Sequence, residues 1–411
     1  MNYIKTVLIT FALFFSVSAE IDTSSQHFYM FSYFKQHETD GQYLGTRLAL
    51  STDGVTWEKY NNEVPIIVPE THMVGKAGGR PLMRDPNIYF DNKTGVFHLT
   101  WTTQWVDDVI GYAYSKDLKH WSTQIKVPVG EKIRNCGCCW APEFFYDDTK
   151  DSVMVLWSTD RDVSGKEAFC SYTKDFKTYT YPELYFEPKT SDSTKYSIID
   201  ETILKVADKK YYLFYKDERV NKGLFPTQVI HCTVGETPRG PWWRGTDQYE
   251  GGSAPMTPIG YEGPTAYIIG DEVRVVSDPF NTPELTKRVK TVKIADLQGA
   301  EPPAKWNDGL KMVTTEGLDF LPSHGSISEI PKAKVLQLLH NIPDPTVYPN
   351  SWTNITKEDI KVLDTPVEET TYPLGKRNCG CGTGVGLAFI PPLFFKGWTL
   401  RRRKKQDTKS K

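Results

Sequence analysis

Five polar residues that could do chemistry together recur along the chain at steps of 58, 57, 62 and 62 residues: Asp85, Glu143, Asp200, Glu262 and His324. Cleavage of a glycosidic bond needs one carboxylic acid to protonate the leaving oxygen and one carboxylate to activate water or attack the sugar. If the fold gathers these acids, their like charges oppose one another's ionisation, and at least one is expected to be held protonated. Capping of strand ends or binding of a calcium ion is the alternative that the residue types leave open.

The elements that would position these residues are short strands. Each polar residue opens a stretch of apolar and aromatic residues, as in Asp85-Pro86-Asn87-Ile88-Tyr89-Phe90, followed by a turn and a second strand. Aromatic residues close the units in a second register, at Trp57, Trp121, Tyr179, Trp242 and Trp306. The 36 to 44 residues from opener to closer are close to the roughly 40 to 50 of a four-stranded propeller blade.

The chain is therefore predicted to be an all-β, five-bladed β-propeller over residues 20–345. The fifth opener is followed by only one or two expected strands, 327–330 and 335–339. The strands that this blade lacks are expected at the other end of the chain, in 27–34 and 44–50, so that pairing of the two ends closes the ring and leaves no open edge. Because inner strands line the central channel of a propeller, the five openers are expected to converge on one axial pocket. Chance spacing in an ordinary β-rich chain is the alternative.

Composition agrees with many short strands and tight turns. The 411 residues include 13% aromatics, 27 prolines and 30 glycines, and one propeller can use the whole length. A net charge of −2 and the lack of a basic stripe in the repeats argue against nucleic acid as a partner.

The sequence patterns at the two ends of the chain are typical of targeting segments. Residues 1–19 combine Lys5, an apolar run and small residues before Glu20, which is typical of a secretory signal peptide, with an uncleaved anchor as the alternative. A linker is expected over 346–378. Residues 379–411 hold a short apolar stretch and then Arg401-Arg-Arg-Lys-Lys405, an order that resembles the C-terminal sorting signals of bacterial envelope proteins. Export and attachment to a membrane or envelope are therefore expected, and a disordered basic tail is the alternative.

Seven cysteines in an exported chain favour disulfides, and their odd number leaves at least one unpaired or intermolecular. Three lie together in Cys136-Gly137-Cys138-Cys139, directly before Trp140. Three soft ligands could bind a metal, although no histidine is near in sequence. The connectivity and role of this cluster stay open.

In order along the chain, five short motifs resemble glycoside hydrolase family 43, the five-bladed propellers that include arabinofuranosidases, xylosidases and arabinanases. They are Arg84-Asp85-Pro86, Trp140-Ala141-Pro142-Glu143, Ser197-Ile198-Ile199-Asp200, Glu262-Gly263-Pro264 and Ser323-His324-Gly325. The likeness runs from about Phe28 to Leu339.

The resemblance implies that Asp85 is the general base, Glu262 the general acid and Asp200 the residue that tunes and orients the acid, with inversion at the anomeric carbon. It further implies sugar binding by Trp140 and Glu143, with Arg84 close by, and matches His324 to an axial histidine near a bound ion at the sugar site. A hydrogen-bonded polar histidine at the channel floor is the alternative for His324. No cofactor is required, and a calcium ion in the central channel is left open.

The function favoured is an exported inverting glycosidase that acts on a polysaccharide or oligosaccharide, of α-L-arabinofuranosidase or β-xylosidase type. A retaining fructosidase-like hydrolase and a non-catalytic carbohydrate-binding propeller are the alternatives. The fructosidase-like hydrolases share the Asp-Pro-Asn motif, but they have a later Glu-Cys pair that is not found here. A non-catalytic carbohydrate-binding propeller would have no need of several ionisable acids in one channel. A purely structural envelope protein is the remaining possibility.

Overall fold

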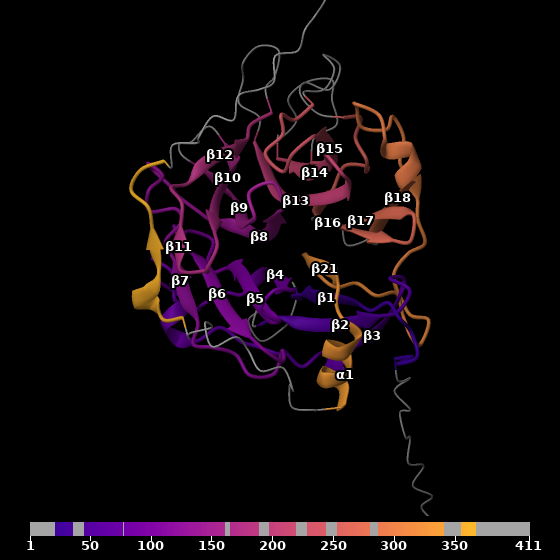
Figure 1. The fold of residues 1–411 in the computed structure, drawn as a ribbon, viewed down its shortest axis with the longest axis horizontal. Helices are drawn as coiled ribbons and strands as arrows, with labels where there is room; N and C mark the ends of the chain where they lie inside the picture. Colours follow the sequence, from indigo (N-terminus) through magenta and orange to yellow (C-terminus); the bar gives the residue numbers. More distant parts are fainter. Residues whose placement is uncertain are drawn as a thin grey trace, which may run out of the picture. The chain divides into compact units, whose positions relative to one another are not determined.

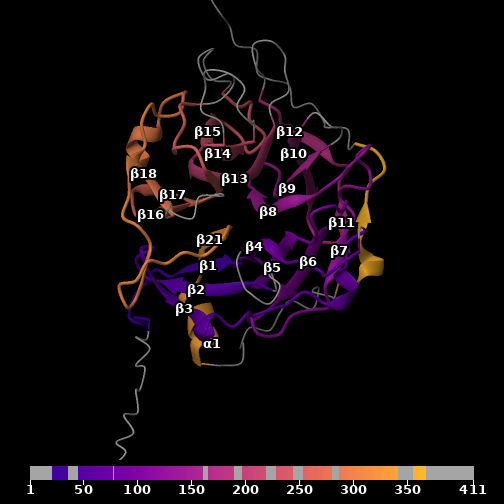
Figure 2. The same ribbon diagram turned by 180° about the vertical axis from the view of Figure 1, so that it is seen from behind.

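The computed structural model describes residues 21–35, 45–76, 78–160, 165–188, 197–218, 228–243, 253–279, 287–340 and 355–366. Their strands form five small, mainly antiparallel sheets arranged around a central axis (Figure 1). Strands β4, β8, β13, β16 and β21 lie nearest the centre in Figure 1, and the same ring is visible from behind (Figure 2). The predicted five-bladed β-propeller is confirmed.

Four blades follow one another along the chain, and each begins with its innermost strand. The first contains β4 (Arg84–Asp91), β5 (Val96–Thr102), β6 (Ile110–Ser115) and β7 (Ile125–Val127). The second contains β8 (Trp140–Asp147), β9 (Ser152–Asp160), β10 (Lys166–Thr173), β11 (Thr178–Tyr179) and β12 (Glu183–Phe186). The third contains β13 (Ile198–Ala207), β14 (Lys210–Asp217) and β15 (Ile230–Gly235), and the fourth β16 (Tyr261–Ile269), β17 (Glu272–Pro279), β18 (Arg288–Lys293) and β19 (Asn307–Asp308). Short 3-10 helices η1 (Tyr60–Glu63), η2 (Thr71–Met73) and η4 (Ile294–Leu297) lie in the connections.

The fifth blade joins the two ends of the propeller. Its inner strand β21 (Gly325–Glu329) pairs with β1 (Tyr29–Tyr33), which continues into β2 (Arg47–Ser51), β3 (Thr56–Lys59) and the short strand β20 (Val313–Thr314). A Cβ at Gly325 would lie 1.8 Å from the Ser32 carbonyl oxygen, so only glycine fits where the strands meet. The expected closure by N-terminal strands is confirmed.

Residues 335–339, expected as a strand, lie instead in α1 (Lys332–His340), and that prediction is wrong. Val335 and Leu338 are buried against the first and fifth blades. Apolar residues three positions apart, with a third at Leu339, share one face of a helix, whereas a strand would alternate them.

The core consists of large aromatic residues packed between blades. Trp57, Trp101, Trp157 and Tyr179 are fully buried, and of the aromatic closers Trp242 and Trp306 are also buried. Trp101 lies directly over Gly111 of the neighbouring strand, where an added Cβ would come within 2.0 Å of the indole. The aromatic register of the sequence therefore marks packing between blades.

Part of the segment expected to be a linker belongs to the fold. Within residues 355–366, η5 (Lys357–Asp359) is followed by β22 (Lys361–Val362), which pairs in parallel with β11 at the outer edge of the second blade. Ile355 and Val362 are buried in the same cluster as Trp157 and Tyr179. Ile360, which is partly buried, packs against the same cluster, so three apolar side chains hold this segment against the blade.

The expected signal segment 1–19, the sorting tail 379–411 and the last two cysteines lie outside the described residues, so these assignments stay predictions. Among the residues that are described, no helix has the length and apolar character needed to cross a membrane.

Candidate active site

A β-bulge near the start of four inner strands sets the geometry of the site. The pairing of β4, β8, β13 and β16 with the next strand shifts register after Arg84, Trp140, Ile199 and Glu262. One residue in each bulge has a left-handed backbone: Asp85 (φ 49°), Ala141 (φ 45°), Asp200 (φ 59°) and Gly263 (φ 57°). Such a conformation is costly for a residue other than glycine and is common where a strand re-aims a side chain at a functional site.

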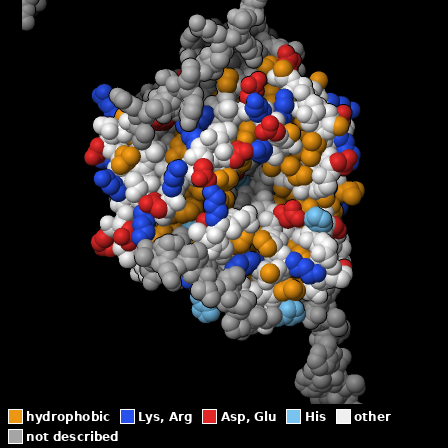
Figure 3. Space-filling view, in the orientation of Figure 1, with side chains coloured by type: hydrophobic (Ala, Val, Ile, Leu, Met, Phe, Trp, Pro, Cys, Tyr) orange, Lys and Arg blue, Asp and Glu red, His pale blue; other side chains and the backbone are white. Residues whose placement is uncertain are grey.

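The bulged ends of the inner strands surround a cavity of about 270 Å³ at the propeller axis. Viewed along the axis, the molecular surface is hollowed near the point where the five sheets meet (Figure 3). Of the expected site residues, the cavity is lined by Arg84, Asp85, Trp140, Asp200, Glu262 and His324. It is also lined by Phe34, Thr102, Trp105, Lys166, Ile199, Lys216, Glu218 and Asp278.

Asp85 is held as a carboxylate. Thr102 Oγ1 donates a hydrogen bond to Asp85 Oδ2 at 2.8 Å, and His324 Nδ1 forms an ion pair with Asp85 Oδ1 at 3.3 Å. Burial alone would raise the pKa of Asp85, but His324 and the charge of Arg84 lower it below its usual value. Burial alone would likewise lower the pKa of His324, but Asp85 and the charge of Asp200 raise it to about 9.

Glu262 has the opposite electrostatic setting. Burial raises its pKa to about 7, with the charge of Lys216 opposing and that of Asp200 adding to the rise. Lys216 Nζ lies 2.9 Å from Glu262 Oε2 and 2.6 Å from Glu218 Oε1, and the lysine side chain is 1% exposed. Near neutral pH a large fraction of Glu262 therefore carries a proton beside an ionised Asp85.

Asp200 interacts electrostatically with both of these carboxyl groups and is fixed by the backbone. Its Oδ2 accepts a hydrogen bond of 3.0 Å from the Gly263 backbone nitrogen, next to Glu262 in the chain. Its own backbone nitrogen donates to Ser158 Oγ at 3.1 Å. Burial raises the pKa of Asp200, opposed by the charge of His324. A fixed carboxyl group at this position can both orient Glu262 and raise its pKa.

One wall of the cavity alternates aromatic rings and cations. The Arg84 guanidinium lies 4.1 Å from the centre of the Trp105 ring, and Lys166 Nζ lies 4.3 Å from that of Trp140. The two indoles meet edge to face at 5.9 Å, and Trp140 Nε1 donates to the Trp105 carbonyl oxygen at 3.0 Å. Trp105 is 47% exposed, so it offers apolar surface to a sugar at the cavity mouth.

Glu143 does not line this cavity, contrary to the expected convergence. The residue of β8 that corresponds to Asp85 is Ala141, and Glu143 lies two residues further along, where it corresponds to Asn87. It lines a second axial cavity of about 250 Å³ together with Asn87, Thr202, Thr265 and Ser326. There it accepts a hydrogen bond of 3.1 Å from Thr202 Oγ1, and burial raises its pKa to about 7.

Sequence reasoning missed Lys216 and Lys166, and it did not select Trp105 as a site residue. Lys216 is the last residue but one of β14, the second strand of the third blade. Lys166 begins β10, the third strand of the second blade, so neither follows the pattern of inner-strand openers. The run Lys216-Asp217-Glu218 after an apolar strand was a signal that polar side chains gather there.

Among the described residues no three His, Cys, Asp or Glu side chains are grouped so that they could hold a metal ion. The calcium ion in the channel stays a prediction.

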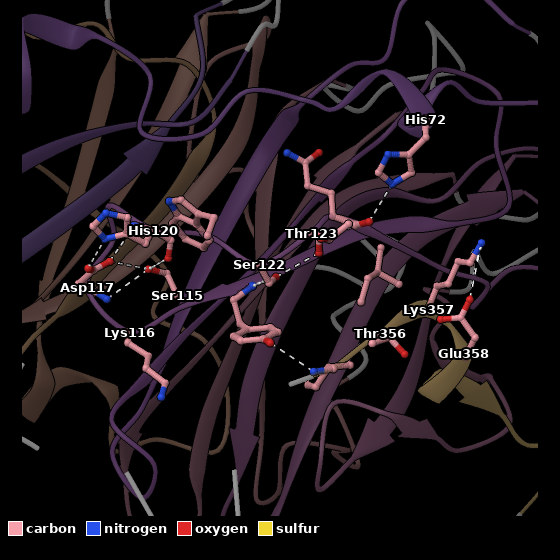
Figure 4. A pocket seen from close by; sticks show the side chains of 15 residues that line it. His72, Ser115, Lys116, Asp117, His120, Ser122, Thr123, Thr356, Lys357 and Glu358 are labelled. Atoms are coloured by element: carbon pink, nitrogen blue, oxygen red, sulfur yellow. Dashed lines mark hydrogen bonds and ion pairs between the residues drawn. The ribbon is translucent and has the colours of Figure 1, made fainter. Parts of the chain in front are cut away.

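A larger cavity, of about 860 Å³, lies away from the axis between the outer edge of the first blade and residues 355–358 (Figure 4). Its charged side chains pair with one another: His120 Nδ1 with Asp117 Oδ2 at 2.7 Å, and Lys357 with Glu358 at 3.7 Å. Of these, His120, Lys357 and Glu358 are largely exposed. Size alone would favour this cavity, but the buried acids with opposed pKa shifts are all at the axis.

The fold and the axial acids together define a five-bladed propeller with the site of a glycoside hydrolase. Residues 25–333 match the model of a protein family related to glycoside hydrolase family 43 and described as "Probable glycosyl hydrolase domain". The chain belongs to this family, which confirms the resemblance stated from the sequence.

Individual relatives are more distant. An α-L-arabinofuranosidase of Bifidobacterium longum is 24% identical over 294 residues, an alignment that covers 59% of this chain and 26% of that protein. The chain thus spans about a quarter of the length of this curated relative. Among solved structures, the Cellvibrio cellulosa α-L-arabinanase complexed with arabinohexaose is similar with a TM-score of 0.49 and 18% identity over 73% of this chain and 96% of that chain. An endo-1,4-β-xylanase from Bacteroides thetaiotaomicron is similar with a TM-score of 0.46 and 15% identity over 70% and 93%.

Proposed function

We propose that this chain hydrolyses O-glycosidic bonds of a polysaccharide or oligosaccharide with inversion, as an α-L-arabinofuranosidase or β-xylosidase type of enzyme. One observation carries the proposal: a single axial cavity holds an ionised carboxylate, Asp85, and a carboxylic acid, Glu262, whose pKa is about 7. These are the two protonation states that inverting hydrolysis needs at one time. The similarity to the Bifidobacterium α-L-arabinofuranosidase supports the pentose preference.

In this mechanism Asp85 takes a proton from a water molecule as the water attacks the anomeric carbon. Glu262 gives its proton to the leaving oxygen as the glycosidic bond breaks. The products are a sugar of inverted configuration and a free hydroxyl group, and proton exchange with solvent restores both carboxyl groups. His324 and Thr102 keep Asp85 ionised, and Lys216 and Asp200 set the pKa of Glu262.

The cavity wall would hold the sugar. Trp105 and Trp140 offer ring surface and Arg84 offers guanidinium donors to hydroxyl groups. Loss of an aromatic contact is expected to raise KM more than it lowers kcat, because the contact is made to substrate and transition state alike.

The proposal is tested by hydrolysis of arabinofuranoside, xyloside, galactoside and fructoside substrates, with the anomer of the product followed by proton NMR. Wild type should release the inverted sugar from one of them, and Asp85→Asn and Glu262→Gln should each lose roughly 10² to 10⁴ in kcat/KM. Glu143→Gln is the matched control, because it removes a buried axial carboxylate from the other cavity. Retention of configuration would favour the fructosidase-like alternative. If no substrate turns over while all variants bind oligosaccharide like wild type, the chain is a non-catalytic sugar-binding propeller.

A further inference from the structure

The cysteine cluster before β8 contains one pair of sulfurs in close approach. Cys136 Sγ and Cys139 Sγ are 3.8 Å apart, and all five described cysteines are thiols. Cys138, between them, is buried on the side of Asp160 and Lys166, whose charges act on its pKa. The geometry thus separates one member of the cluster from the other two, which the sequence could not do.

The surrounding loop is built to receive two adjacent sulfurs. A Cβ added at Gly130 would lie 2.6 Å from Cys136 Sγ and 2.8 Å from Cys139 Sγ, so any side chain there would displace both. The Cys136 backbone nitrogen donates to the Ile133 carbonyl oxygen at 3.2 Å, which closes a turn before the pair. The Gly137 backbone nitrogen donates to Asp160 Oδ1 at 3.0 Å, which holds the turn between the two cysteines.

The two thiols differ in the way that disulfide exchange requires. Cys136 is partly exposed and its Sγ also contacts Thr159 Oγ1 at 3.2 Å. The hydrogen bond with Cys139 lowers the pKa of Cys136, with Thr159 adding to the effect, whereas burial raises the pKa of Cys139. An accessible thiol with a lowered pKa beside a buried one, with two residues between them in the sequence, resembles the attacking and resolving positions of a Cys-x-x-Cys pair.

We propose that Cys136 and Cys139 form a reversible disulfide that fixes the loop in front of Trp140. The Cys136 thiolate attacks one sulfur of an external low-molecular-weight disulfide such as oxidised glutathione, and one thiolate leaves. The Cys139 sulfur, after losing its proton to solvent, attacks the mixed disulfide at the Cys136 sulfur and releases the second thiolate. Two protein thiols lose two electrons and two protons, and one external disulfide becomes two thiols. The protein sulfurs move from 3.8 Å to the ~2.05 Å of an S–S bond.

The disulfide would act on the catalytic cavity through the start of β8. Cys139 is followed by Trp140, which lines the cavity, and the Ala141 backbone nitrogen donates to Thr102 Oγ1 at 2.8 Å. That same hydroxyl donates to Asp85. This consequence for activity rests on the proposed function, whereas formation of the bond does not.

Bond formation is tested on the full chain after equilibration with oxidised or reduced glutathione. The samples are quenched with acid, denatured and alkylated. The mass of the peptide that contains residues 136–139 is then measured by mass spectrometry. After oxidation we expect alkylation at Cys138 alone, and after reduction at all three cysteines. Cys136→Ser and Cys139→Ser should each abolish the protected form, and Cys232→Ser, which removes a buried thiol of another blade, should not. Full alkylation of the oxidised wild type, a bond that includes Cys138, or a link between chains would overturn the assignment.

The effect of the disulfide on the catalytic cavity is tested by two measurements on oxidised and reduced protein. The first is the KM of wild type for the substrate that it hydrolyses. The second is the dissociation constant of an oligosaccharide from the Glu262→Gln variant. Oxidation should change KM and the dissociation constant at least about threefold, because a shift of under 1 Å in a contact residue is felt by the bound substrate. The KM of the Cys136→Ser variant should be the same after treatment with oxidised and with reduced glutathione. An unchanged KM and dissociation constant with the bond formed would refute the coupling. A bond formed in a protein that turns over no substrate would instead count against the proposed function.

Discussion

Replacement of Lys216 by methionine is the sharpest test of how Glu262 is kept as an acid. The lysine side chain is 1% exposed, and its Nζ lies 2.9 Å from Glu262 Oε2. Its charge opposes the effect of burial and so keeps the pKa of Glu262 from rising beyond about 7. Methionine has similar length and no charge, so the variant removes the cation and keeps most of the packing.

The size and sign of the effect follow from this contact. A hydrogen bond to a charged group in a protein contributes about 1.5 to 3 kcal/mol, and one pKa unit corresponds to about 1.36 kcal/mol. The pKa of Glu262 should therefore rise by about one to two units. Glu218, which loses the same partner at 2.6 Å, adds negative charge that acts in the same direction. The active form of a general acid is the protonated one, so the basic limb of the pH profile should move to higher pH.

The measurement is kcat/KM from pH 4 to 10 on whichever substrate of the glycoside panel the wild type hydrolyses. Wild type should lose activity as pH rises through about 7, and Lys216→Met should keep it to roughly pH 8 or 9. Lys205→Met, which breaks the surface pair with Asp148, is the matched control and should leave the profile unchanged. If Lys216→Met folds like wild type and its basic limb stays in place or moves to lower pH, Glu262 is not the group that sets this limb.

Other expectations concern the same acid and the packing of the blades. Asp200→Asn removes a negative charge that raises the pKa of the proton donor, so the basic limb should move to lower pH; a move upward would contradict the electrostatic account. Ile355→Ala, at a side chain 4% exposed, should lower the free energy of unfolding in urea by about 2 to 4 kcal/mol. Leu310→Ala, at an exposed side chain, should lower it by almost nothing. Equal effects would mean that 355–366 is not packed on the blade in solution. Gly111→Ala drives a Cβ into Trp101 and should cost at least about 1 to 3 kcal/mol, and an unchanged melting temperature would argue against this contact.

The repeat in the sequence predicted much of the fold and most of the site. Strand openers at regular spacing predicted the five blades, and the convergence of Asp85, Asp200, Glu262 and His324 follows from the propeller topology alone. The closure by β1 was predictable because the last repeat was short of strands.

The bulges were not predictable from hydrophobic pattern, and they moved Glu143 to the other cavity. A bulge changes which residue faces the channel without changing the spacing of the repeats. The prolines held the missing signal: Pro86, Pro142 and Pro264 each follow the left-handed residue of their bulge. Alignment on these prolines makes Ala141 the counterpart of Asp85.

Long-range packing explains the remaining differences. Lys216 reaches Glu262 from a neighbouring blade, and no local pattern reports such a contact. The short strand at 361–362 pairs with residues almost two hundred positions earlier. Its own two residues, Lys361 and Val362, form no pattern that would predict a strand.

The closure of the fifth blade also has a consequence for synthesis. Strand β1 is among the first described segments to leave the ribosome, yet its inner partner β21 is among the last. With about 290 residues between them, elongation at roughly 5 to 20 residues per second leaves one edge of β1 without its partner for some 15 to 60 s. An apolar strand with an open edge is a template for pairing with other chains. Nascent chains on neighbouring ribosomes could therefore exchange β1, and slower translation of the last two blades should increase the yield of such swapped dimers.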